Sequence, residues 1–326
     1  MFAGVECEYP VTIETERPTV AVASTSFSAN RTLIAELAAI GVEVVRNVDG
    51  RRLDAEEALA EFIGSAEYAV VGQEPVGEEV IAACPNLEIV AKYGVGLDNV
   101  DEAALVAGGV KLGWTGGVNR RSVTELTLAF ALGHLRNVWP SVSLMRKGQW
   151  DKVGGRELSG CRFGIVGLGH IGADVARIVR AFGATVAYRD IVDRSVIAEE
   201  LGLRSMEYEE LLREANVVSF HVPATPLTKE MFGATEIALM KPGSLVINTA
   251  RGRVIRFAET VDAVRAGRLG GFAADVFPSE PFDASAFAGD DRLYFTPHIG
   301  GNSCEAIMAM GRSAIRHLRR HIKEGR

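Results

Sequence analysis

The stretch FGIVGLGHIG, residues 163–172, decides the fold expected for this chain. An apolar run that ends in glycines and continues as IGADVARIVRAFG predicts a buried strand, a tight turn and a helix. The glycines have the spacing of a dinucleotide-binding loop: Gly167 permits the turn, Gly169 lets the backbone approach a pyrophosphate, and Gly172 lets helix and strand pack closely. The free N–H groups of the first helical turn would then face the phosphates.

An acidic residue at the end of the next strand, TVAYRD, favours NAD over NADP. Asp190 can accept hydrogen bonds from the ribose hydroxyls of NAD, and its charge repels the 2′-phosphate of NADP. The neighbouring Arg189 would weaken this discrimination. The alternative is a glycine turn that serves packing alone, beside a solvated Asp190. We expect NAD to bind at Gly167, Gly169, His170, Ile171, Gly172 and Asp190.

The length and the charge of the chain narrow the class of protein. With 326 residues, of which 48% are hydrophobic and 24% charged, the chain is expected to fold into two domains. A formal net charge of −7 argues against a nucleic-acid surface, which usually carries excess Lys and Arg. The expected partner is a small anionic molecule. We expect no regulatory domain after the core, since the chain ends at Arg326.

Neither a membrane nor a metal is expected. The N-terminal MFAGVECEYP has acids where a signal peptide needs positive charge, and no apolar run approaches the roughly 18 residues that span a bilayer. The cysteines lie far apart and lack metal-ligand spacing, which fits buried thiols in a reducing cytoplasm. They are Cys7, Cys84, Cys161 and Cys304.

Two series of apolar, β-branched runs alternate with helical patterns after about 18 residues of extension. The first comprises TVAVASTSF, VEVVRNV, YAVVGQEPV, LEIVAKYGVG and GVKLGWT, and the second CRFGIVGL, ATVAYRD, ANVVSFHVP, GSLVINTA and GGFAADVF. Such runs are typical of fully buried parallel strands. We expect two doubly wound α/β domains, Rossmann-like or flavodoxin-like, with a cleft between them.

A long apolar helix is expected between the two series, in SVTELTLAFALGHLRNVWPSVSLM. Ser122 and Glu125 have capping-box spacing, so Ser122 is expected to cap this helix. The rest is apolar on nearly every face, which predicts burial either between the domains or against a second subunit. We expect a homodimer, the commonest soluble oligomer.

Polar residues follow several strands of the second series, where open α/β sheets bind ligands. They are His221, Arg251, Asp275, Glu280 and His298. Reducing a 2-keto acid builds negative charge on the carbonyl oxygen, so the site needs a cation and a proton donor there. Arg251 offers a charged fork that matches a carboxylate. His298 can donate a proton in reduction and accept one in oxidation, and Glu280 can orient its imidazole.

From about residue 20 to near the C-terminus, these segments together resemble the D-isomer-specific 2-hydroxyacid dehydrogenases, a family that includes phosphoglycerate dehydrogenases and glyoxylate/hydroxypyruvate reductases. The resemblance rests on INTARGR, ADVFPSEP and TPHIGG beside the glycine motif. It implies that Arg251 binds the substrate's carboxylate and carbonyl, that His298 is the acid/base, and that Glu280 is its partner. Contacts to the cofactor are implied for Val222, Pro223, Thr249, Ala250 and Asp275, and for His221 unless that residue only bonds the backbone.

The resemblance also assigns the domains and the substrate loop. It implies a discontinuous substrate domain, residues 1–117 with 300–326, closed by the helix AIMAMGRSAIRHLRRHI, and an NAD-binding domain, residues 118–299. The residues expected to hold the substrate are Lys92, Tyr93, Gly94, Val95, Gly96 and Asn119. Asp98 and Asn99 are expected to cap the following helix. His134, His170, His317 and His321 belong to no constellation and are expected to be structural or exposed.

The sequence predicts a small 2-hydroxy or 2-keto acid as the substrate and leaves open which acid it is and whether it is phosphorylated. Gly72 and Gln73 stand where phosphoglycerate enzymes commonly have an arginine, a departure that argues against phosphoglycerate. Arg120 and Arg121 either bind a second anionic group or are solvated charges. The alternatives are a glyoxylate/hydroxypyruvate reductase and an NAD-sensing co-repressor. A formate dehydrogenase would pair its histidine with glutamine, which Glu280 argues against.

Overall fold

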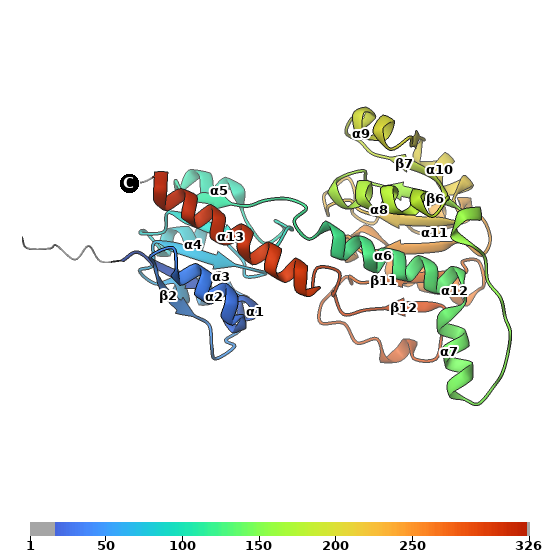
Figure 1. Ribbon diagram of the computed structural model, residues 1–326, viewed down its shortest axis with the longest axis horizontal. Coiled ribbons are helices and arrows are strands. Elements are labelled where there is room, and N and C mark those ends of the chain that lie inside the picture. The colour runs from blue at the N-terminus through green and yellow to red at the C-terminus, as the bar shows by residue number, and fades with distance from the viewer. Residues whose placement is uncertain (1–16, 325–326) are drawn as a thin grey trace, which may run out of the picture. The chain divides into compact units, whose positions relative to one another are not determined.

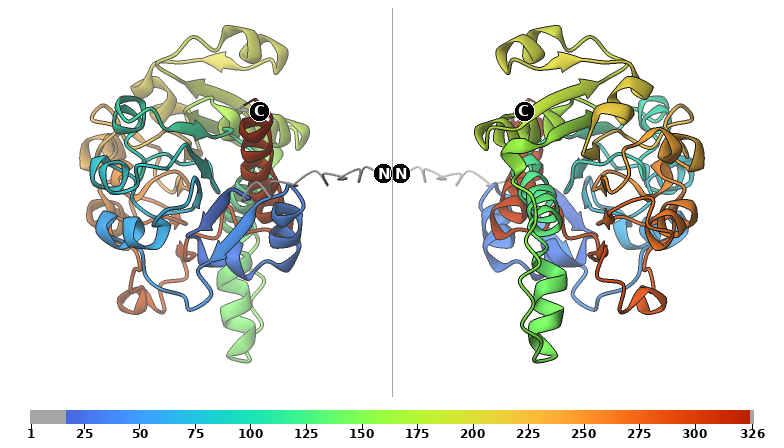
Figure 2. Two further views of the ribbon diagram at one scale, coloured as in Figure 1. Left: turned by 90° about the vertical axis from the view of Figure 1, so that its left-hand side faces the viewer. Right: turned by 90° about the vertical axis from the view of Figure 1, so that its right-hand side faces the viewer.

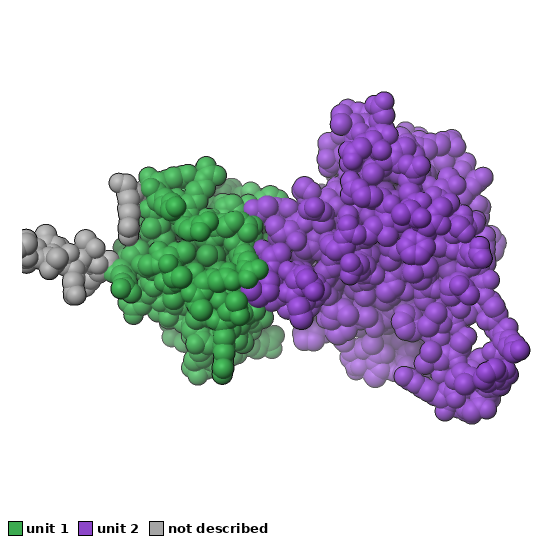
Figure 3. All heavy atoms as spheres, viewed as in Figure 1, with its two compact units in different colours: residues 1–114, 311–326 green, residues 115–310 purple. Residues whose placement is uncertain are grey.

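The computed structural model describes residues 17–324, which form two compact α/β units (Figures 1 and 3). The described residues up to Trp114 and from Gly311 onward form the first unit, and Thr115–Met310 form the second. The expected N-terminal extension lies almost wholly outside the described residues, as does Cys7. No helix within residues 17–324 has both the length and the apolar character that crossing a bilayer requires.

The first unit contains a five-stranded parallel sheet in the order β2-β1-β3-β4-β5. Its strands are β1 (Thr19–Val22), β2 (Glu43–Arg46), β3 (Tyr68–Val71), β4 (Ile89–Lys92) and β5 (Lys111–Gly113). The inner strands β3 and β4 are buried throughout. The expectation that VEVVRNV is a fully buried strand is wrong, because β2 is an edge strand whose Glu43 and Arg46 are exposed.

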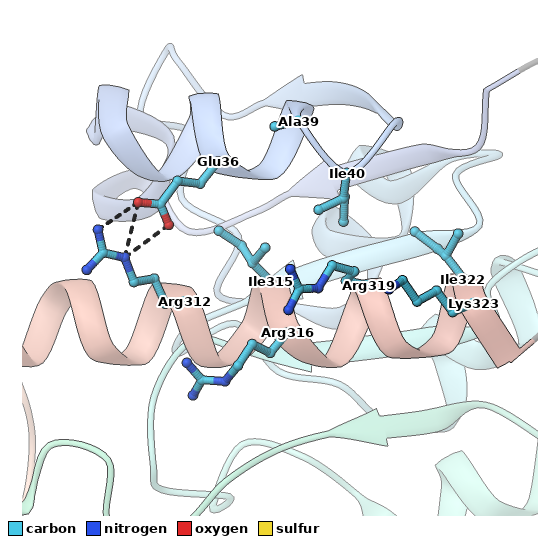
Figure 4. Close-up of a pocket in the computed structure, with 9 residues that line it drawn as sticks. All are labelled: Glu36, Ala39, Ile40, Arg312, Ile315, Arg316, Arg319, Ile322 and Lys323. Carbon is cyan, nitrogen blue, oxygen red and sulfur yellow. Dashed lines mark hydrogen bonds and ion pairs between the residues drawn. The ribbon is translucent and has the colours of Figure 1, made fainter.

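The C-terminal helix returns to this unit and packs on one of its helices. The helices of the unit are α1 (Thr25–Ala29), α2 (Arg31–Ala38), α3 (Glu56–Ile63), α4 (Glu78–Ala83), α5 (Glu102–Ala107) and most of α13 (Cys304–Glu324). A Cβ atom on Gly311 would lie 2.3 Å from Leu33 Cδ1, so α13 and α2 touch closely. Beside this contact Arg312 pairs with Glu36 at 2.7 Å, at one end of a groove between the two helices (Figure 4).

The second unit contains a seven-stranded parallel sheet in the order β12-β11-β10-β9-β6-β7-β8. Its strands are β6 (Arg162–Val166), β7 (Thr185–Arg189), β8 (Arg204–Ser205), β9 (Val217–Phe220), β10 (Leu245–Asn248), β11 (Gly271–Ala274) and β12 (Leu293–Phe295). The short edge strands β8 and β12 were not expected. The predicted fold class, two parallel-sheet α/β domains, is confirmed.

Helices flank the second sheet, and two large apolar clusters fill the space between them and the strands. The helices are α6 (Arg120–Leu135), α7 (Val138–Arg146), α8 (His170–Ala181), α9 (Ser195–Glu200), α10 (Tyr208–Glu214), α11 (Ala234–Leu239) and α12 (Phe257–Arg265). Three short 3₁₀ helices cover Leu158–Gly160, Gly252–Val254 and Ser285–Phe287.

The single long helix expected between the two series is two helices, and its expected cap is wrong. Asn119 is the N-cap residue of α6, so Ser122 lies inside the first turn, where its Oγ accepts a hydrogen bond from the Ser303 amide. Asn137 adopts a left-handed backbone, φ 50°, and ends the run before α7 begins. Within the described chain α7 has no buried residue and extends away from its unit's sheet (Figures 1 and 2), so its burial against a second subunit stays a prediction.

The turn between β6 and α8 is built on close backbone contacts. Gly167 has φ 96°, a conformation that favours glycine, and a Cβ atom there would lie 2.7 Å from the His221 carbonyl oxygen. A Cβ atom on Gly172 would lie 2.0 Å from the Gly167 carbonyl oxygen. Apart from Gly169 and its neighbours in the chain, no atom of the described residues lies within 4 Å of the position for a Cβ atom on Gly169. Two of the glycines are therefore required by packing, and the third leaves space open.

Replacing two of these glycines shows which one is needed for packing. Gly172→Ala should lower the free energy of unfolding by about 1–3 kcal/mol, because a methyl group there must displace backbone. Gly169→Ser is the matched control and should unfold like the wild type, because serine is a favourable N-cap and its Cβ meets nothing. Thermal unfolding of both variants without added nucleotide checks this. Equal losses would show that Gly172 is not a packing contact.

Candidate active site

The glycine loop leaves room for a phosphate group at the start of α8. Gly169 is the N-cap residue of this helix, and His170 and Ile171 follow in its first turn. The amide groups of a first turn have no partner inside the helix, so they can bind an anion. The open space at Gly169, beside closely packed Gly167 and Gly172, is the shape that a pyrophosphate needs.

Asp190 follows β7 directly and is tied to the same loop. One carboxylate oxygen accepts a hydrogen bond from the Leu168 amide at 2.7 Å, and the other accepts one from the Val192 amide at 2.9 Å. Arg194, which the sequence reasoning missed, pairs with Asp190 at 3.3 Å. Arg189 lies 3.7 Å from Glu207 and so has a carboxylate partner of its own. Asp190 is therefore an acid in direct contact with the glycine loop.

His221 follows β9 and is held as a neutral side chain. Its Nε2 lies 2.9 Å from the Ser219 hydroxyl, and its buried Nδ1 has no hydrogen-bond partner among the described residues. Burial lowers the pKa of His221 to about 3, since charge is costly away from water. Val222 and Pro223 continue the chain, and the Val222 side chain packs against Gly167. This segment therefore borders the glycine loop, where a cofactor contact was expected.

Arg251 follows β10 in a tightly bonded turn. Asn248 accepts a hydrogen bond from the Ala250 amide at 3.1 Å and donates one to the Arg251 carbonyl at 2.9 Å. The Thr249 hydroxyl lies 3.2 Å from that of Thr127 on α6. The Arg251 guanidinium, half-buried, donates to the Ala250 carbonyl at 2.7 Å. The turn thus fixes where the arginine leaves the sheet.

Asp275 follows β11 and organises the loop that carries His298. The side chain is 1% exposed and accepts three hydrogen bonds, from the Thr296 hydroxyl at 2.6 Å, the Ile299 amide at 2.8 Å and the Gly300 amide at 2.7 Å. Burial raises the pKa of Asp275, and these hydrogen bonds act in the opposite direction. Sequence reasoning assigned Asp275 only to the cofactor and missed this role, although Thr296 stands in the TPHIGG segment.

Glu280 and His298 form a direct pair, as the sequence analysis expected. His298 Nδ1 lies 2.7 Å from one Glu280 carboxylate oxygen, and the other oxygen accepts a hydrogen bond from the Phe277 amide at 3.0 Å. The His298 backbone is left-handed, with φ 53°. With Nδ1 directed at the carboxylate, Nε2 is the nitrogen that can exchange a proton with a substrate.

The loop expected to bind the substrate belongs to the first unit. Tyr93 is buried edge-on against Phe27, and burial raises its pKa; Gly94, Val95 and Gly96 follow. Lys92 is 4% exposed, and its ammonium donates to the Gly72 carbonyl and, at 2.7 Å, to the Asn99 side chain. The expected cap at Asp98 or Asn99 is wrong, because Asp101 caps the next helix and Asn99 bonds Lys92.

Three polar residues near the start of α6 were considered as ligand-binding residues. Asn119 is 7% exposed, and its Oδ1 has no hydrogen-bond partner among residues 17–324. Arg121 is exposed and pairs at 3.0 Å with Asp174, a buried acid on α8, so it already has a carboxylate partner. Arg120 is exposed.

Among the described histidines and cysteines outside the site, some have structural surroundings, whereas His170 and Cys304 are exposed. His134 lies 3.1 Å from the Tyr294 hydroxyl, and burial lowers its pKa to about 4. His321 lies 2.7 Å from a Glu88 carboxylate oxygen. Buried thiols were expected, and Cys84 and Cys161 are buried; Cys304 is exposed, so the expectation is wrong there.

Comparison with known proteins agrees with this arrangement. Residues 128–300 match the family model described as D-isomer specific 2-hydroxyacid dehydrogenase, NAD binding domain. A D-3-phosphoglycerate dehydrogenase of Mycobacterium leprae is 36% identical over 87% of this chain and 54% of its own length. The chain thus spans about half the length of that relative. A glyoxylate reductase of Thermococcus litoralis is 32% identical over 75% of this chain and 77% of its own length.

A solved structure resembles this chain in its fold over nearly the whole length. A glyoxylate reductase from Paecilomyes thermophila superposes with a TM-score of 0.82, covering 95% of this chain and 97% of that one, at 23% identity. The cofactor expected from the glycine loop, NAD, is confirmed by the family match. The chain belongs to the D-isomer specific 2-hydroxyacid dehydrogenase family.

Proposed function

We propose that this chain is an NAD-dependent oxidoreductase that interconverts a small D-2-hydroxy acid and its 2-keto acid. One observation carries the proposal: an imidazole paired with a carboxylate at 2.7 Å follows the same sheet that presents Arg251 and the glycine loop. In a parallel sheet the carboxyl ends of the strands meet at one edge. The second unit therefore supplies a base, a cation and a nucleotide site.

Each side chain has a role set by its chemistry. NAD, when bound, accepts or supplies the hydride. Arg251 binds the substrate's carboxylate and carbonyl, and its charge stabilises the negative oxygen that develops in reduction. His298 gives a proton to that oxygen in reduction, and takes it from the hydroxyl in oxidation. Glu280 orients the imidazole through its Nδ1. His221 is neutral and contacts the cofactor.

We infer a substrate without a phosphate group, such as glyoxylate or hydroxypyruvate. The backbone amides of residues 93–96 hold its carboxylate. Lys92, the cation adjoining this loop, is buried and bonded to Gly72 and Asn99 rather than directed at solvent. Gly72 and Gln73 add no cation. A phosphorylated acid, such as 3-phosphoglycerate, is the second candidate, since the relatives of this branch include phosphoglycerate dehydrogenases.

A panel of 2-keto acids scored by NADH consumption tests the activity. Glyoxylate, hydroxypyruvate and phosphohydroxypyruvate should include at least one substrate. His298→Ala should lose about 10²- to 10⁴-fold in kcat while still binding NADH, because the general acid is gone. His317→Ala is the matched control, since His317 lies in the first unit on α13, and it should keep its kcat.

Two outcomes would contradict the proposal. Wild-type turnover by His298→Ala would remove this residue from the mechanism. NADH binding without turnover of any acid would favour the alternative, an NAD-sensing co-repressor that reports cofactor state to a protein partner.

The cofactor preference should follow from Asp190. The wild type should have a kcat/KM for NADH at least about tenfold higher than for NADPH. The reason is that Asp190 cannot make its charge-assisted hydrogen bonds to a ribose that carries the 2′-phosphate. Asp190→Ala should bring the two kcat/KM values closer together, mainly by lowering the value for NADH. Glu199→Gln, which removes one negative charge at an exposed residue of α9, is the control and should leave the ratio unchanged. Equal use of both cofactors by the wild type would refute the assignment.

We further propose that the chain works as a homodimer in the cytoplasm. Apolar side chains of α7 and the segment after it are exposed, which a monomer rarely tolerates in one patch. They are Val138, Trp139, Val142, Met145, Trp150 and Val153. Cys84, Cys161 and Cys304 are free thiols, as in a reducing compartment.

The dimer is tested by measuring molecular mass in solution. Val142→Glu should dissociate it, because the new charge would be buried in the interface. Val196→Glu, a matched change at an exposed residue of α9, should not. A monomeric wild type, or dissociation by both variants, would contradict the proposed interface.

A further inference from the structure

Six phenylalanines form one cluster beside the segment that carries Glu280. Two of them are central: Phe257 on α12 and Phe295 on β12 each contact all the other rings, with centroids 5.1–6.4 Å apart. The phenylalanine cluster consists of Phe257, Phe272, Phe277, Phe282, Phe287 and Phe295. Aromatic pairs in edge-to-face or stacked geometry are directional, so a cluster of this kind fixes the positions of its members.

The segment from Phe277 to Phe282 is closed on itself by its two end rings. These rings are stacked, with centroids 4.2 Å apart and planes 5° from parallel. Inside the closed segment the Phe277 amide donates a hydrogen bond to Glu280, whose other carboxylate oxygen meets His298. The direction of the carboxylate therefore depends on the backbone between the two rings.

The same cluster also adjoins the other two site residues. Phe295, which meets Phe277 edge-on at 5.6 Å, lies three positions before His298 in the chain. Gly252, the residue after Arg251, packs on the Phe277 backbone: a Cβ atom there would lie 2.0 Å from the Phe277 carbonyl carbon. Arg251, Glu280 and His298 are thus all placed relative to Phe277.

We propose that the stacked pair Phe277–Phe282 is a positioning device for the Glu280–His298 pair, which rests on the function proposed above. Phe282 is half-buried; its ring packs against the apolar core of the unit and closes the segment. Without the stack, the segment opens and the carboxylate leaves the imidazole. Phe282 is a positioning residue and touches no reacting atom.

A comparison of two leucine variants tests the proposal. Phe282→Leu should lower kcat about tenfold with little change in KM for NADH, because small displacements of a catalytic group are costly. Phe287→Leu is the matched control: Phe287 is half-buried in the same cluster, 5.9 Å from Phe282, but outside the closed segment. It should keep kcat within about twofold, although it loses similar packing. Phe282→Tyr, which keeps the ring, should restore activity. Equal losses of kcat in the two leucine variants would overturn the proposal.

A double-mutant cycle shows whether Phe282 acts through the carboxylate. If it does, adding Phe282→Leu to Glu280→Gln should cost little further kcat, because the pair that it positions is already broken. Multiplicative effects on kcat would overturn the proposal, since they would mean that the ring acts independently of Glu280.

A structural readout keeps the proposal testable should the chain reduce no 2-keto acid. Hydrogen exchange at the Phe277 amide reports its hydrogen bond to Glu280 directly. Phe282→Leu should speed this exchange, and Phe287→Leu should not. Absent turnover in the wild type would then defeat only the proposed function, whereas unchanged exchange in Phe282→Leu would defeat the positioning device.

Discussion

The position of His298, the proposed acid/base, depends on one buried carboxylate. Asp275 gathers a hydroxyl and two amides of the loop around His298, and so holds that residue in a left-handed backbone that costs on the order of 1 kcal/mol. Removing the carboxylate would leave these donors unpaired and release the strain. The imidazole would then lose its fixed distance to Glu280. The geometry around His298 is thus set by a residue that need not touch the substrate.

The two units contribute different kinds of structure to the proposed reaction. The second unit contains the charged and titratable groups, fixed by strand ends and by the phenylalanine cluster. The first unit contributes a glycine-containing loop whose neighbour Lys92 is bonded internally, together with Asn99, to the chain around Gly72. A buried ammonium that is fully bonded stabilises backbone rather than recognising a ligand. This difference is the basis for proposing that the acid/base and its partner come from the second unit.

Local patterns predicted what depends on local geometry. The strands and the glycine turn are readable because period, spacing and residue type decide them, whereas the Glu280–His298 pair was expected from the family resemblance. The cap at Ser122 was misplaced because Asn119 starts the helix a turn earlier, and Asn99 was misread because its side chain bonds Lys92, the last residue of β4. Arg194 and the stacking of Phe277 on Phe282 were invisible because ion pairs and ring contacts depend on packing, which one sequence does not display.

The central claim is that Arg251 and His298 act on one substrate molecule. A crystal structure of the protein with NADH and an unreactive 2-keto acid analogue tests it most directly. The account predicts the Arg251 guanidinium within hydrogen-bond distance of the analogue's carboxylate, and His298 Nε2 facing its carbonyl oxygen beside the nicotinamide. An analogue bound by one of these side chains with the other turned away, in a complex that holds the cofactor, would contradict it.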